Sequence, residues 1–130
     1  MKKQTFIIEI TGTGFSAYAA DLPVFTTGRN LHELKLNCLE ALQLYYEDIH
    51  ESCSLPDISL EVDLQQFFKY YHIINSRFLA HRIGMNASLL SQYVMGHKHP
   101  SARQTEKILR GIQEIGKELS DIGALRRSRV

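Results

Sequence analysis

The chain has 130 residues, of which 44% are hydrophobic and 22% are charged, a composition typical of a folded globular protein. No stretch approaches the roughly 18 consecutive apolar residues that a membrane-spanning helix needs. The basic start is followed by an apolar run that Glu9 interrupts, and no cleavage-site pattern follows. We therefore expect a soluble, cytoplasmic protein without a secretory signal, and no membrane partner.

The net charge of +1 conceals two halves of opposite sign. Residues 1–63 contain four Lys or Arg and ten Asp or Glu, a net charge of −6, whereas residues 64–130 contain eleven and four, a net charge of +7. A basic half is typical of a module that binds phosphates, and an acidic half repels DNA and attracts a basic partner. Chance asymmetry on two solvated surfaces is the alternative.

The first half predicts a small sheet with one helix. Apolar residues alternate along residues 6–10, and the turn at 11–14 contains two glycines. Further strands are expected at residues 15–20, 24–27 and 58–62, each separated from the previous element by turn residues. The expected order is strand, strand, strand, helix, strand.

The helix of this half is expected to begin after Asn30, with Glu33 three positions later in a capping-box-like arrangement. Its apolar stripe consists of Leu31, Leu34, Cys38, Ala41, Leu42, Tyr45 and Ile49. More apolar residues lie largely off this stripe, namely Leu36, Leu39, Leu44 and Tyr46. Either a subunit interface or a two-sided core would use them.

Asp63 can cap the next helix, with Gln66 at the reciprocal position, so almost no linker separates the halves. We place the domain boundary between residues 62 and 63. The apolar face of this helix is expected to comprise Phe67, Phe68, Tyr71 and Ile74.

Two short helices joined by a tight corner follow. Asn75 or Ser76 caps the first, whose residues Leu79, Ala80 and Ile83 have helical spacing, and Gly84 can adopt the left-handed conformation that ends it. Asn86 caps the second helix, which buries Leu90 and Tyr93 or Val94 and ends at Gly96. Its outward face carries small or polar side chains, namely Ala87, Ser88, Ser91 and Gln92.

Ser101 is expected to cap a long last helix, with Gln104 at the matching offset. An apolar seam with alternating steps of four and three runs through Ile108, Ile112, Ile115, Leu119 and Ile122. Three glycines weaken this helix, so the seam fits packing within the chain and a dimer contact equally well. The tail at 126–130 is basic and is expected to be disordered.

The pattern from Leu79 to Pro100, LAxxIGxxxxxLSxxxxGxxxP, resembles the lambda repressor/Cro class of helix-turn-helix. The resemblance implies a recognition helix in the DNA major groove, with Ala87, Ser88 and Gln92 at base edges. Phosphate contacts are expected from Ser76, Lys98, His99 and Arg103. One domain makes few contacts, so a homodimer or higher oligomer that binds an inverted repeat is expected.

The first half resembles the HicB family of antitoxins in its strand FSAYAADLP, its TTG turn and a helix with Glu in the first turn and a later EAL segment. The resemblance implies an α+β fold, with a β-β-β-α-β partial RNase H-like domain at residues 1–62 and an all-α lambda repressor-like domain at 63–130. It also implies an antitoxin that blocks a small basic, RNA-cleaving toxin of the HicA type and represses its own operon. The alternative is a free-standing transcriptional regulator whose first domain oligomerises or senses a ligand.

We expect no enzyme activity, no cofactor and no metal. Glu9, Asp21 and Glu61 are the carboxylates that could mark a nuclease site, but their expected positions do not converge clearly. His97 and His99 flank Lys98 in a turn, an arrangement suited to phosphate contact. Two cysteines fifteen apart, Cys38 and Cys53, have no partner at metal-ligand spacing and are expected to be reduced.

Overall fold

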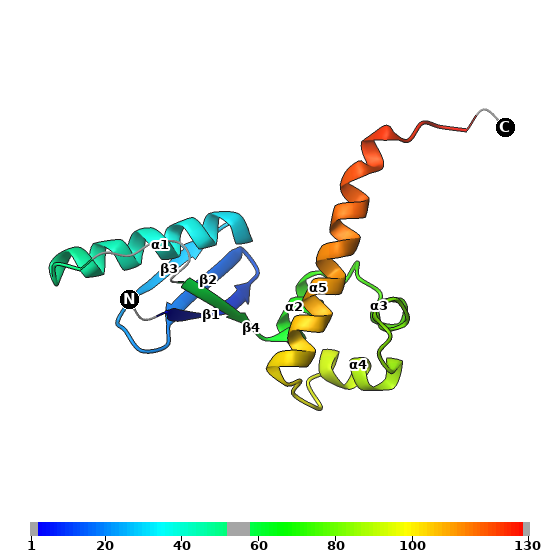
Figure 1. Ribbon diagram of the computed structural model, residues 1–130, viewed down its shortest axis with the longest axis horizontal. Helices are drawn as coiled ribbons and strands as arrows, with labels where there is room; N and C mark the ends of the chain where they lie inside the picture. The colour runs from blue at the N-terminus through cyan, green and yellow to red at the C-terminus, as the bar shows by residue number, and fades with distance from the viewer. Residues whose placement is uncertain (1–2, 52–57, 129–130) are drawn as a thin grey trace. The chain divides into compact units, whose positions relative to one another are not determined.

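A computed structural model describes residues 3–51 and 58–128. Its elements are β1 (Gln4–Thr11), β2 (Gly14–Ala19), β3 (Phe25–Gly28), α1 (Leu31–Asp48), β4 (Ile58–Val62), α2 (Leu64–Tyr70), α3 (Ser76–Ile83), α4 (Ala87–Val94), α5 (Ala102–Leu119) and the 3-10 helix η2 (Ser120–Ala124). Helices and one sheet are therefore mixed in the chain (Figure 1). None of the described helices is long and apolar enough to cross a membrane.

The chain divides into two compact units, one ending at Tyr70 and one beginning at Tyr71. This division falls later than the boundary expected after Val62, because α2 contacts β1. The assignment of separate functions to residues 1–62 and 63–130 remains a prediction.

The described strands of the first unit form one sheet in the order β3-β2-β1-β4. β1 pairs antiparallel with β2, and β2 pairs antiparallel with β3, so these strands form two successive hairpin pairings. β4 pairs parallel with β1, which requires a crossover, and α1 lies between β3 and β4 in the chain. The alternation expected in the first strand is confirmed, since Phe6 and Ile8 are buried and Glu9 is exposed.

Helix α1 covers one face of the sheet with residues four positions apart. Leu34, Cys38 and Leu42 are fully buried, as expected. The end of the expected stripe is wrong: Tyr46 is buried and Ile49 is 46% exposed. Tyr46 is held because its hydroxyl accepts a hydrogen bond of 3.1 Å from Nε2 of Gln4 on β1. Of the residues expected off the stripe, Leu36 and Leu44 are exposed.

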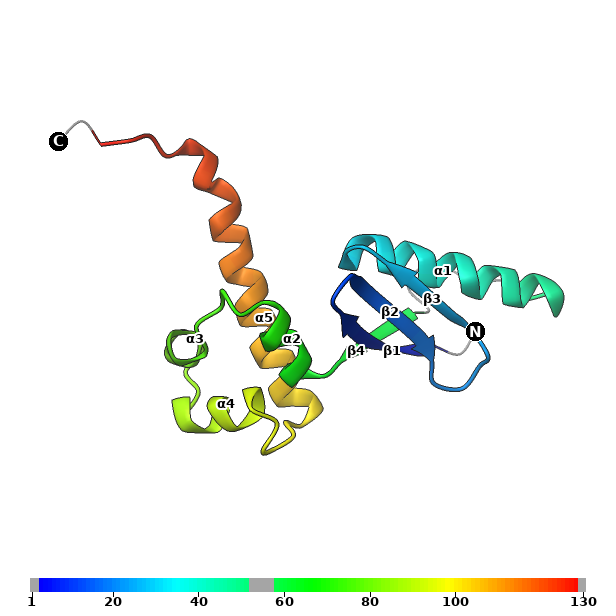
Figure 2. The same ribbon diagram turned by 180° about the vertical axis from the view of Figure 1, so that it is seen from behind.

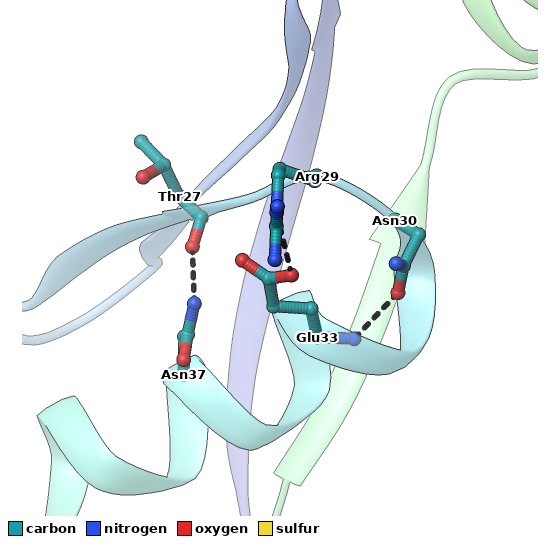
Figure 3. A network of polar contacts seen from close by, with 5 residues as sticks. All are labelled: Thr27, Arg29, Asn30, Glu33 and Asn37. Carbon is teal, nitrogen blue, oxygen red and sulfur yellow. Dashed lines mark hydrogen bonds and ion pairs between the residues drawn. The ribbon is translucent and has the colours of Figure 1, made fainter.

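A polar network joins β3 to the start of α1 (Figure 3). The Asn30 side chain accepts from the backbone N–H of Glu33 at 2.8 Å, which confirms the cap. The Glu33 carboxylate pairs with Arg29 at 3.1 Å, and Asn37 donates to the carbonyl of Thr27 at 2.7 Å. These contacts fix the first two turns of the helix against the strand.

Helix α2 is shorter than expected. The Asp63 side chain accepts from the backbone N–H of Gln65, which confirms its capping role, but the helix ends at Tyr70 and excludes Tyr71. The Gln66 side chain is not at its expected capping position. Its Oε1 instead accepts from the backbone N–H of Ile10 at 3.0 Å, at the end of β1.

The Cys38 thiol lies in the core of the first unit. Burial raises the pKa of Cys38 to about 11, so the thiol is protonated at neutral pH and is a poor nucleophile. Cys53 and the turn expected around Pro56 lie outside the described residues.

The second unit packs α3 and α4 against α5. Its core comprises Leu79, Ala80, Leu90, Tyr93 and Ile108. Gly111 on α5 is buried where α5 meets α3, and a Cβ there would lie 2.3 Å from Cγ2 of Ile83. In both views α5 continues well beyond α3 and α4 (Figures 1 and 2).

Candidate nucleic-acid interface

The corner between α3 and α4 has the geometry expected from its sequence. Asn75 caps α3, its side chain accepting from the backbone N–H groups of Arg77 at 3.0 Å and Phe78 at 3.2 Å. Gly84 ends the helix with φ of 70°, and the backbone N–H of Met85 reaches the carbonyl of Ala80 at 2.9 Å. This is a Schellman-type end, in which a left-handed glycine lets the chain turn at once.

Helix α4 is fixed at both ends. The Asn86 side chain accepts from the backbone N–H of Leu89 at 3.1 Å, and Leu90 is fully buried beneath the helix. At the other end the Gln92 carbonyl accepts from the backbone N–H groups of His97 at 2.9 Å and Lys98 at 3.2 Å. The turn that carries Lys98 is therefore held by α4 itself.

The predicted base-facing residues differ in exposure. Ala87 and Ser88, at the N-terminal end of α4, are exposed, whereas Ser91 and Gln92 are half-buried. The Ser91 hydroxyl lies 3.7 Å from the sulfur of Met95, one turn later. The first turn of α4 is thus its most accessible part, which suits a helix that enters a groove with its N-terminal end.

The predicted phosphate contacts lie at three places in the second unit. Ser76 begins α3 and is half-buried, Lys98 and His99 are exposed in the turn after α4, and Arg103 is exposed in the first turn of α5. Ser76 is therefore distant in the sequence from the other three, which lie in the turn after α4 and at the start of α5.

Arg103 also lines a groove of about 530 Å³ between the end of α3 and α5. The other lining residues are Arg82, Ile83, Gln104, Glu106, Lys107, Arg110, Gly111 and Glu114. Sequence reasoning missed this basic group, although Arg103, Lys107 and Arg110 have helical spacing. Arg82 comes from another helix, so only the packing of α3 on α5 brings it there.

Carboxylates in this groove neutralise part of its charge. Glu106 pairs with Arg110 at 2.5 Å, and Arg82 pairs with Glu118 farther along α5. Both pairs are solvent-exposed and contribute little stability. The groove therefore has a mixed surface, less suited to phosphate than the exposed turn around Lys98.

The carboxylates considered for nuclease chemistry belong to the first unit. Glu9 on β1 and Glu61 on β4 are exposed on the sheet face opposite Phe6, and Asp21 lies in the connection between β2 and β3. Among residues 3–51 and 58–128, no group of three or more His, Cys, Asp or Glu side chains could hold a metal ion.

No known protein-family model matches the chain, and no curated protein matches it significantly.

Proposed function

We propose that the chain is a DNA-binding antitoxin that represses its own operon. The observation that carries the DNA-binding part is the capped corner between α3 and α4, with an accessible first turn of α4 and a basic turn after it. In this proposal the second half is a lambda repressor-like domain and the first half a HicB-like, partial RNase H-like domain. Two copies bind the half-sites of an inverted repeat, about one helical turn of DNA apart.

In the proposed complex α4 lies in the major groove. Ala87 contacts a thymine methyl, and Gln92 pairs with adenine, for which its half-buried side chain must extend towards the base. Ser76, Lys98, His99 and Arg103 contact phosphates and fix the register. The excess of basic residues in this half, eleven against four acidic ones, supports such contacts.

Substitution of Gln92 tests this placement. Gln92→Ala is expected to weaken binding to a DNA fragment from upstream of the gene by about 1–3 kcal/mol, with little change in binding to a scrambled fragment. Fluorescence anisotropy titrations of the full chain at several salt concentrations measure both. Gln113→Ala, which removes an exposed glutamine from α5, is the matched control. An equal loss on both fragments would show that Gln92 does not contact bases.

The antitoxin part is supported by the charge of the first half, −6 from four basic and ten acidic residues. Such a surface attracts a small basic toxin of the HicA type and repels DNA. The full chain is expected to bind the protein encoded by a small basic reading frame beside its gene, and to restore growth when both are expressed. Its affinity should fall as salt rises, because exposed charges are screened.

Lack of binding to that protein would favour the second candidate, a free-standing transcriptional regulator whose first half oligomerises or senses a ligand. The exposure of Leu36 at 48% and Leu44 at 58% on α1 is the observation that favours an interface there. Sedimentation of a Leu36→Ser, Leu44→Ser double variant tests whether this surface of α1 mediates self-association. Weaker self-association would support that role, whereas unchanged self-association is expected if toxin binding uses a surface elsewhere.

A further inference from the structure

Among residues 3–51 and 58–128, none covers the second half of the seam on α5. Ile108 is fully buried, but exposure rises to 58% at Leu119, 61% at Ile122 and 71% at Leu125. All residues from Gly116 to Ser128 are exposed, although helical backbone continues to Ala124. The core of the unit thus ends about halfway along the seam, and the apolar side chains beyond it are exposed. The ribbon shows α5 and the segment after it extending past α3 and α4 (Figure 2).

This exposed segment is unlike an ordinary surface helix. Ile115, Leu119 and Ile122 continue the spacing of four and three that characterises helix pairing. Gly116 and Gly123 follow two of these residues directly, and an added Cβ at either position would meet nothing within 4 Å. Each glycine lowers helix stability by about 1 kcal/mol without any contact within the chain that requires it. Small residues beside an apolar seam allow a second helix to approach closely.

The order of charges along the segment indicates what the second helix is. Acidic residues predominate first, with Glu114, Glu118 and Asp121 against the single Lys117, and the basic residues Arg126 and Arg127 come last. Glu118 also pairs with Arg82 of its own chain. An antiparallel second copy places each basic end beside the other's acidic stretch, whereas a parallel copy places like charges together. The segment is therefore complementary to itself in one orientation only.

We propose that the ridge formed by Ile115, Leu119, Ile122 and Leu125 is an antiparallel dimer interface between two copies of this chain. It supplies the dimer that the proposed binding to an inverted repeat requires. Self-association of the chain is measured in the absence of DNA and toxin. A chain that does not dimerise can therefore be distinguished from a chain that does not bind DNA.

The test compares two lysine substitutions in the same turn of η2. Ile122 lies on the ridge, whereas Ala124, two residues later in a 3-10 helix with three residues per turn, lies off it. Both are exposed, so neither substitution disturbs a core. Sedimentation and light scattering of the full chain are expected to give twice the chain mass of 14.9 kDa for the wild type and for Ala124→Lys. Ile122→Lys is expected to raise the dimer dissociation constant about 100-fold, because the dimer would bury a lysine from each copy.

Two results would overturn the interface: a wild-type chain that stays monomeric at all concentrations, or an Ile122→Lys variant that associates as tightly as the wild type. The orientation has its own test. Replacing Arg126 and Arg127 together with Ala is expected to weaken an antiparallel dimer several-fold at low salt. Tighter association of this variant would mean that the arginines repel each other in a parallel dimer, and the antiparallel arrangement would be wrong.

Discussion

Gly28→Ala is expected to destabilise the sheet unit by about 3 kcal/mol, near the upper end of the usual cost of overpacking. A Cβ at residue 28 would lie 2.7 Å from the backbone nitrogen and 2.8 Å from the Cα of Leu34. These are backbone atoms of α1, so no side-chain rotation relieves the clash. The helix would have to move off β3, although Leu34 is fully buried and Asn37 is bonded to Thr27.

Hydrogen exchange measured by mass spectrometry can follow this loss in β1, β2 and α1 separately from the second unit. Faster exchange is expected in these three elements, with α3 to α5 unchanged. Gly12→Ala is the matched control, because a Cβ at Gly12 meets nothing within 4 Å. If both variants exchange like the wild type, α1 and β3 are not held at the close distance that the structure shows.

The sequence predicted best those features that depend on neighbours in the chain. The caps Asn30, Asn75, Asn86 and Ser101 each accept from a backbone N–H two or three residues later, so a short window contains all the information. The strand positions followed from the sequence pattern with errors of at most two residues.

Features that depend on distant residues were not predictable in this way. Tyr45 and Tyr46 are equally apolar neighbours, but Tyr46 lies four residues after the buried Leu42 and its hydroxyl accepts a hydrogen bond from Gln4 on β1, a partner that the helical pattern does not include. Gln66 matched a capping pattern, but the end of β1 uses its side chain instead. In the candidate interface, Arg82 joins Arg103 only through helix packing.

The limit of the seam is a further example. Its spacing from Ile108 to Ile122 is uniform, so sequence alone left packing within the chain and dimer contact equally open. In the structure Ile108 is buried and Ile122 is 61% exposed, so packing within the unit accounts for the start of the seam and not for its end. The core ends where the shorter helices α3 and α4 no longer cover α5. The spacing of apolar residues in the sequence does not show where that is.

Gly111→Ala is expected to destabilise the second unit by about 2 kcal/mol, although alanine improves intrinsic helix stability by about 1 kcal/mol. The new Cβ would lie 2.3 Å from Cγ2 of Ile83, the last residue of α3. Because Gly84 follows immediately, a displaced Ile83 also moves the corner that positions α4. Thermal unfolding and DNA affinity of the full chain should therefore both decrease.

Ile83→Leu provides the matched test, since leucine lacks the methyl group on Cβ that would clash. Alone it is expected to cost less than about 1.5 kcal/mol, and in combination with Gly111→Ala it should recover most of the lost stability. Strictly additive losses would show that residues 83 and 111 do not contact each other. If the double variant recovers stability but not DNA affinity, α5 sets the position of α4 through this contact. If Gly111→Ala leaves the DNA affinity of the folded chain unchanged, the corner between α3 and α4 alone determines the position of α4.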